Sequence, residues 1–151
     1  MRAVVLVGGR GSRLRPLTDH VPKPMLPIGH RPMIAALVDR LARAGVDDVT
    51  LALGFRPEPF VAAFPDGRVG HVTLRYAVEP EPLDTAGAIR FAADHAGIDS
   101  TFVVANGDIV SDLAVADLVA AHRRAGAEAT LHLTPVDDPS IYGVVPTDDT
   151  G

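Results

Sequence analysis

Residues 8–24 of the chain read GGRGSRLRPLTDHVPKP and directly follow an apolar run at residues 3–7, AVVLV. The apolar run is short and rich in β-branched residues, which is typical of a buried strand. Gly8, Gly9 and Gly11 then allow a tight turn in which backbone N–H groups converge on one point. Amides oriented in this way bind phosphate groups when cations lie nearby. The stretch therefore predicts a phosphate-binding loop directly after a first strand.

Two common glycine loops are excluded by the residues around this turn. A Walker A loop requires Lys and then Ser or Thr after its last glycine, but Gly11 is followed by Ser12 and Arg13. A dinucleotide-binding fingerprint that begins at Gly9 requires a small residue where Leu14 stands. A dinucleotide-dependent oxidoreductase is therefore a poor interpretation of the loop.

The complete pattern is Gly-Gly-x-Gly-Ser-Arg-Leu-x-Pro-Leu-Thr, and it closes with Pro-Lys-Pro at residues 22–24. It resembles the signature of the sugar-1-phosphate nucleotidyltransferases, or NDP-sugar pyrophosphorylases, and the resemblance covers nearly the whole chain. This resemblance implies transfer of a nucleotidyl group from a nucleoside triphosphate to a sugar 1-phosphate, with release of pyrophosphate. It also implies that Arg13 and Lys23 are catalytic residues that act on the phosphates. The loop residues expected to bind the nucleotide are Leu6, Gly8, Gly9, Gly11, Ser12 and Arg13.

Composition narrows the class of protein and its partners. The chain has 151 residues, of which 47% are hydrophobic, and this is typical of one globular domain spanning residues 1–151. Its formal net charge of −5, with acidic residues spread along the chain, argues against a nucleic-acid partner. It has no cysteine, which excludes disulfides and thiol catalysis. The N-terminal apolar run is too short for a signal peptide or a membrane span. We therefore expect a cytoplasmic protein without a membrane partner, and a homo-oligomer is compatible with the sequence.

Strand-like and helix-like segments alternate along the chain. Apolar runs predict strands at 49–53, 72–78, 101–105 and 129–134, and helical periodicity predicts helices at 33–44, 59–64, 86–96 and 113–125. This alternation predicts an α/β fold with a mainly parallel sheet, and the family resemblance specifies a Rossmann-like three-layer α/β/α domain. Ligands bind such sheets beyond the carboxyl ends of the strands. We therefore expect the residues after several strands to open onto one edge of the sheet.

Asp108 is the candidate ligand for a catalytic Mg²⁺. It follows the predicted strand at 101–105 in the sequence Asn106-Gly107-Asp108, and in the resembled family the acid of this motif binds the metal. A carboxylate facing an anionic substrate requires a cation between them, and Mg²⁺ takes few protein carboxylates together with phosphate oxygens. The structural alternative is an Asx turn or a helix N-cap, for which Ser111 and Asp112 compete.

Residues 79–88, EPEPLDTAGA, resemble the stretch with which the family recognises the nucleobase. Glu79 stands at the base-reading position, although the sequence does not decide between Glu79 and Glu81. A carboxylate only accepts hydrogen bonds, and guanine presents two adjacent donors at N1 and its 2-amino group. Uracil and thymine present one N–H between two carbonyl groups. Glu79 therefore favours GTP, and Thr85 is expected to contact the same nucleotide.

Asp84 departs from the family pattern, which generally has glycine before Thr-Ala-Gly. The side chain adds bulk and negative charge beside a polyanionic nucleotide, so we expect it to weaken nucleotide binding. The fold need not suffer, because Asp is a favourable N-cap for the helix predicted at 86–96.

The remaining motifs concern the sugar. By resemblance, Asn106 and Gly107, together with Tyr142 and Gly143 in the predicted strand 142–145, are expected to contact it. The resemblance is strongest to family members that act on GTP and mannose 1-phosphate. Thymidylyl or uridylyl transfer to glucose 1-phosphate is the close alternative.

The last residues leave a third interpretation open. The predicted strand 142–145 has no return strand after it, so the chain reads as one truncated at its C-terminus. The family usually takes a second metal-binding acid and a sugar-binding lysine from residues beyond position 151. A non-catalytic nucleotide-binding fragment or regulatory paralogue therefore stays an alternative.

Overall fold

The computed structural model describes residues 1–9, 11–54, 57–141 and 143–148. It contains two compact units, Met1–Ala116 and Asp117–Gly151. The strands are β1 (Arg2–Leu6), β2 (Pro27–Ile28), β3 (Arg31–Pro32), β4 (Asp48–Leu53), β5 (Arg68–Val69), β6 (Val72–Val78) and β7 (Val103–Asn106). The helices are α1 (Met33–Arg43), α2 (Glu58–Ala63), α3 (Asp84–His95) and α4 (Val115–Ala125), with 3₁₀ turns at Ser12–Leu14, Lys23–Met25 and Pro139–Ile141.

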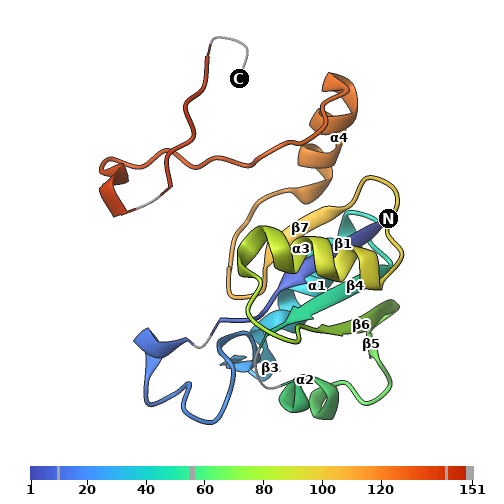
Figure 1. The fold of residues 1–151 in the computed structure, drawn as a ribbon, viewed down its shortest axis with the longest axis vertical. Helices are drawn as coiled ribbons and strands as arrows, with labels where there is room; N and C mark the ends of the chain where they lie inside the picture. Colours follow the sequence, from blue (N-terminus) through green and yellow to red (C-terminus); the bar gives the residue numbers. More distant parts are fainter. Residues whose placement is uncertain (10, 55–56, 142, 149–151) are drawn as a thin grey trace. The chain divides into compact units, whose positions relative to one another are not determined.

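The first unit is built on a five-stranded sheet in the order β5-β6-β4-β1-β7 (Figure 1). The strands β6, β4, β1 and β7 run parallel, and only β5 pairs antiparallel, with β6. The prediction of a mainly parallel sheet is therefore confirmed. A pair of short antiparallel strands, β2 and β3, lies outside this sheet.

Helices cover the two faces of the sheet, as the three-layer prediction requires. On one face, Ala88 and Ala92 of α3 pack against Val4, Ala52 and Ala77 of the strands. Helix α1 lies on the opposite face (Figure 1) and buries an apolar stripe at Ile34, Ala35, Val38 and Leu41. The small side chains of Ala88 and Ala92 let this helix approach the sheet closely.

The parallel register brings four strand ends to one edge. Leu6 of β1 is opposite Ala52 of β4 and Asn106 of β7, and Leu53 is opposite Val78 of β6. Hydrogen bonds continue the ladder by one residue: Val7 N donates to Ala52 O at 3.1 Å, Glu79 N to Leu53 O at 2.9 Å, and Gly107 N to Leu6 O at 2.8 Å. The segments that follow these strands therefore start from fixed neighbouring positions.

The second unit differs from the sequence prediction. Residues 129–134 and 143–145 were predicted as strands, but neither forms one, and Tyr142 lies outside the described residues. Residues 129–134 alternate apolar and polar side chains, which marks a strand only if a partner strand buries one face. The described residues of this unit include no such partner, so Leu131 and Leu133 are 67% and 47% exposed.

Helix boundaries move by one to two residues from the predicted ones: α2 covers 58–63, α3 covers 84–95 and α4 covers 115–125.

Across the described ranges of the chain, no helix combines the length and the apolar character needed to cross a lipid bilayer.

Replacement of Gly107 by Ala tests the packing at the edge of the sheet. A Cβ at this buried position would collide with Val7 Cγ1 and lie 3.1 Å from Leu6 O, so the end of β7 would have to move. We expect Gly107→Ala to lower the free energy of unfolding by about 1–3 kcal/mol in urea denaturation. The control is Gly9→Ala, because a Cβ there meets no described atom within 4 Å. Equal unfolding midpoints for the two variants would contradict this packing.

Candidate functional site

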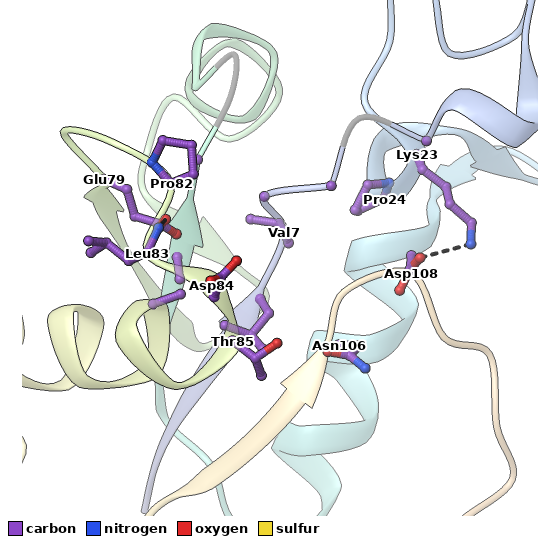
Figure 2. Close-up of a pocket in the computed structure, with 17 residues that line it drawn as sticks. Val7, Lys23, Pro24, Glu79, Pro82, Leu83, Asp84, Thr85, Asn106 and Asp108 are labelled. Atoms are coloured by element: carbon purple, nitrogen blue, oxygen red, sulfur yellow. Dashed lines mark hydrogen bonds and ion pairs between the residues drawn. The ribbon is translucent and has the colours of Figure 1, made fainter. Parts of the chain in front are cut away.

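A pocket of about 530 Å³ opens at the edge where the parallel strands end. It is lined by the residues after β1, β4 and β7, by the beginning of α3, and by the 3₁₀ turn at Lys23–Met25 (Figure 2). Ten of the residues predicted from the sequence line it: Leu6, Gly8, Gly9, Gly11, Lys23, Glu79, Asp84, Thr85, Asn106 and Asp108. The expectation that the residues after several strands open onto one edge of the sheet therefore located the pocket correctly.

The glycine loop packs closely against a second glycine. A Cβ on Gly8 would lie 3.3 Å from the backbone nitrogen of Gly54, and a Cβ on Gly54 would lie 3.5 Å from Gly8 Cα. Both positions also lie within 4 Å of the Glu79 carboxylate. The prediction overlooked Gly54, which follows β4 as Gly8 follows β1, so the rule that located the loop could have found it.

Glu79 holds its own loop in place. Its Oε2 accepts a hydrogen bond from the backbone nitrogen of Leu83 at 3.2 Å, which closes the turn before α3. Glu79 lines the pocket, whereas Glu81 is exposed and does not. Of the two acids between which the sequence did not decide, Glu79 is therefore the one that lines the pocket.

Gly11 turns the chain back toward the pocket. Its φ is +61°, a left-handed conformation that favours glycine, and its carbonyl accepts hydrogen bonds from Leu14 N at 2.9 Å and Thr18 Oγ1 at 2.8 Å. A Cβ here would lie 3.0 Å from Thr18 Cγ2 and 3.2 Å from Lys23 Cβ. Gly11 therefore lets the segment 11–18 pack directly against the base of the Lys23 side chain.

Lys23 and Asp108 meet across the pocket. Lys23 Nζ donates to Asp108 Oδ2 at 2.8 Å, and both side chains stay partly exposed (Figure 2). Pro22 and Pro24, both buried, flank the lysine and restrict its backbone. Asp108 is not a helix cap, because α4 begins seven residues later and the Asp108 carboxylate pairs with Lys23. The ion pair joins the segment after the glycine loop to the end of β7.

Asp84 is the first residue of α3 and not its N-cap, which is Leu83. The prediction of an N-cap role for Asp84 was therefore wrong. The helix begins at Asp84 itself, two residues before the predicted start, and the backbone N–H of Leu83 donates to Glu79 Oε2. The φ of Asp84 is +56°, and Figure 2 shows its carboxylate directed into the pocket.

Four predicted residues do not line the pocket, and Tyr142 lies outside the described residues. Ser12 and Arg13 form an exposed 3₁₀ turn after the loop. Gly107 is buried beneath the edge, where it packs on β1, and Gly143 belongs to the second unit. The sequence placed these residues by motif, which does not reveal which side chains face a cavity.

The charges of the described lining residues constrain the ligand. Three carboxylates, Glu79, Asp84 and Asp108, face one cation, Lys23. A polyphosphate can enter such a pocket only with additional positive charge. In the described part of the chain, no group of three or more His, Cys, Asp or Glu side chains is arranged to hold a metal. The one carboxylate of Asp108, which lines the pocket together with the glycine loop, could hold Mg²⁺ carried by a phosphate ligand, because Mg²⁺ uses one or two carboxylates and keeps water and phosphate ligands.

Known proteins resemble this chain along most of its length. The family model described as nucleotidyl transferase matches residues 2–151. The mannose-1-phosphate guanyltransferase of Schizosaccharomyces pombe is 46% identical over 147 residues, which cover 96% of this chain and 40% of the relative. The mannose-1-phosphate guanylyltransferase of Mycobacterium tuberculosis is 44% identical over 147 residues, covering 97% of this chain and 41% of the relative. The chain thus spans about two fifths of the length of these relatives.

Solved structures agree with the sequence comparison. HddC from Yersinia pseudotuberculosis, complexed with GMP-PN, superposes with a TM-score of 0.70 and 29% sequence identity. The match covers 80% of this chain and 53% of HddC. The match of the family model to residues 2–151 shows that this chain belongs to the nucleotidyl transferase family, and the parallel sheet and the glycine loop of the chain agree with it.

Proposed function

We propose that the chain is the nucleotide-binding part of a mannose-1-phosphate guanylyltransferase, which joins GTP and mannose 1-phosphate into GDP-mannose and pyrophosphate. The observation that carries this proposal is the convergence of the glycine loop, Glu79 and the Lys23–Asp108 pair on one pocket. Relatives about 45% identical carry the corresponding name, which supports the choice of substrates. A cytoplasmic location and the absence of a nucleic-acid partner stay predictions from the sequence.

Glu79 is suited to the base. Its Oε2 already accepts the Leu83 N–H, but each carboxylate oxygen has two lone pairs, so both oxygens remain able to accept from a base. Guanine can donate to them from N1 and from its 2-amino group. Uracil and thymine offer only one donor on that edge. Glu79 would therefore bind guanine better than either pyrimidine.

The glycine loop and Lys23 are suited to the phosphates. Gly8, Gly9 and Gly11 allow close approach of the backbone, and Lys23 is a mobile point charge on a long stem. A phosphate oxygen of mannose 1-phosphate would attack the α-phosphorus of GTP in line, and pyrophosphate would leave. The residues act by positioning the reactants and stabilising the charge that develops, without a covalent intermediate on the protein.

Asp108 is the residue that would hold Mg²⁺, since its carboxylate lines the pocket at the phosphate end. When bound, Mg²⁺ neutralises phosphate charge and polarises the phosphoryl oxygens. Asp108 would have to exchange its contact with Lys23 for this cation, which frees the lysine ammonium for the phosphates. Asn106, the last residue of β7, lines the pocket, and we expect it and the adjacent Gly107 to contact the sugar.

Pyrophosphate release tests the proposal. The chain is incubated with Mg²⁺ and each combination of GTP, dTTP or UTP with mannose or glucose 1-phosphate, and calorimetry measures nucleotide binding in parallel. We expect GTP to bind most tightly and to react with mannose 1-phosphate. Reaction of dTTP or UTP with glucose 1-phosphate would instead identify the thymidylyl- or uridylyltransferase. Binding of GTP without release in any combination would indicate a non-catalytic nucleotide-binding fragment.

Arg13→Ala tests the role of the exposed turn after the loop. We expect pyrophosphate release to fall by about 100-fold or more, because a cation that stabilises the leaving group is lost. The control is Arg15→Ala, which removes an arginine of the same segment that pairs with Asp19 at 3.3 Å. Equal activity of the Arg13 and Arg15 variants would exclude Arg13 from catalysis.

Glu79→Gln tests base recognition. Gln keeps an acceptor for the Leu83 N–H but replaces one carboxylate oxygen by a donor, which faces the guanine donors unfavourably. We expect the preference for GTP over UTP in calorimetry to fall about tenfold, as for one charge-assisted hydrogen bond. Glu81→Gln is the matched control, because Glu81 does not line the pocket. An unchanged preference in the Glu79 variant would contradict the assignment.

Lys23→Met separates stability from binding at the ion pair. Partly exposed ion pairs contribute little, so we expect unfolding free energy to change by less than about 1 kcal/mol. Affinity for GTP should fall about tenfold or more, since the phosphates lose a cation. In the control Arg90→Met, which breaks the exposed Arg90–Asp94 pair on α3, stability changes equally little and GTP affinity stays the same. A large loss of stability with normal GTP binding would make the pair structural.

A further inference from the structure

Asp84 combines an unfavourable backbone conformation with a side chain that faces the pocket. Its φ of +56° makes it the only non-glycine residue with a positive φ in the described ranges. Glycine adopts this conformation freely, whereas the Cβ of an L-residue crowds the neighbouring carbonyl. The chain therefore keeps a carboxylate at a position where glycine would fit with less strain.

The fold makes no use of this carboxylate. Leu83 is the N-cap of α3, and the cap has no side-chain hydrogen bond. Within the described residues, the Asp84 carboxylate forms neither a hydrogen bond nor an ion pair. A negative charge in the first helical turn interacts favourably with the helix dipole, but this effect does not require the side chain to line the cavity. The neighbouring Glu79 carries the same charge and offers Asp84 no attraction.

The place of Asp84 in the pocket indicates what it can contact. Figure 2 shows its carboxylate between Glu79 on one side and the Lys23–Asp108 pair on the other. With the base at Glu79 and the phosphates at Lys23, the part of a nucleotide that lies between them is the ribose. A carboxylate has two acceptor oxygens, and a ribose presents two adjacent hydroxyl donors. Acidic side chains read ribose hydroxyls in this way in other α/β nucleotide-binding sites.

We propose that Asp84 accepts hydrogen bonds from the ribose hydroxyls of the bound nucleotide and thereby selects ribonucleotides over 2′-deoxyribonucleotides. The proposal rests on the proposed function, because it requires a nucleotide with its base at Glu79. Asp84, which stands where the family generally has glycine, thus recognises the ribose of the nucleotide and does not merely crowd it. It also disfavours dTTP as the donor, independently of the base.

Three nucleotides separate the contacts in a calorimetric binding experiment with Mg²⁺. GTP and dGTP differ only in the 2′-hydroxyl group, whereas GTP and ITP differ only in the 2-amino group of the base. We expect the unmodified chain to bind GTP about tenfold more tightly than dGTP, the effect of one charge-assisted hydrogen bond. In Asp84→Gly this ratio should fall to within about twofold of unity, while the ratio of GTP to ITP stays the same.

The substituted residues are chosen so that the fold persists. Glycine suits a φ of +56°, so Asp84→Gly should melt at or above the temperature of the unmodified chain. Asp84→Asn keeps the shape and one acceptor oxygen, and should give an intermediate ratio of GTP to dGTP. The ratio is the decisive readout, because loss of a negative charge alone tightens the binding of both nucleotides equally.

Two results would overturn the proposal. The first is an unchanged ratio of GTP to dGTP in Asp84→Gly, with both nucleotides bound more tightly, which would show that Asp84 only repels the phosphates. The second is a fall in the preference for GTP over ITP in Asp84→Gly, with an unchanged preference for GTP over dGTP, which would place Asp84 at the base. If the unmodified chain bound none of the three nucleotides, the proposed function itself would fail, and this outcome is distinct from both.

Discussion

The parallel pairing of β1 with β4 on one side and β7 on the other is the constraint on which the pocket depends. In a parallel register, Leu6, Ala52 and Asn106 share one level of the sheet, so the segments after β1, β4 and β7 must begin side by side. Gly8, Gly54 and Gly107 then keep this edge free of side chains where backbones pack closely. The acids that follow, Glu79 and Asp108, come directly after β6 and β7, which end at the same edge on opposite sides of β4 and β1. The geometry of the site thus follows from the sheet, and the loops add the chemical groups.

The charged side chains are distributed unevenly between the two sides of the pocket. Glu79 and Asp84 lie on the segment that leads into α3, and Lys23 and Asp108 face each other where the glycine loop returns to the sheet. An arrangement with two carboxylates at one side and a lysine paired with a carboxylate at the other is unsuited to an apolar ligand. It suits a molecule with donor groups at one end and anionic groups at the other, and a nucleoside triphosphate has this form. The excess of carboxylates over described cations also explains why such a ligand would enter together with a divalent cation.

The sequence predicted the parts of the molecule that depend on local patterns. The strand at 72–78, the glycine loop and the pocket position of Asp108 all follow from apolar runs and from the residues directly after them. Three features needed the structure because they depend on contacts between distant residues. That Glu79 lines the pocket and Glu81 does not depends on which side chain packs near Gly8 and Gly54. The N-cap at Leu83 depends on a hydrogen bond from its own N–H to Glu79. The predicted strand at 129–134 failed because alternation of side chains cannot supply the partner strand that it requires.

A crystal structure of the chain with GTP and Mg²⁺ tests the central claim most directly, because it shows where each part of the nucleotide lies. The account predicts the triphosphate over Gly8–Gly11, the guanine edge within hydrogen-bonding distance of Glu79, and Lys23 turned from Asp108 toward the phosphates. A nucleotide bound in the reverse direction, or bound away from the edge of the sheet, would contradict the account.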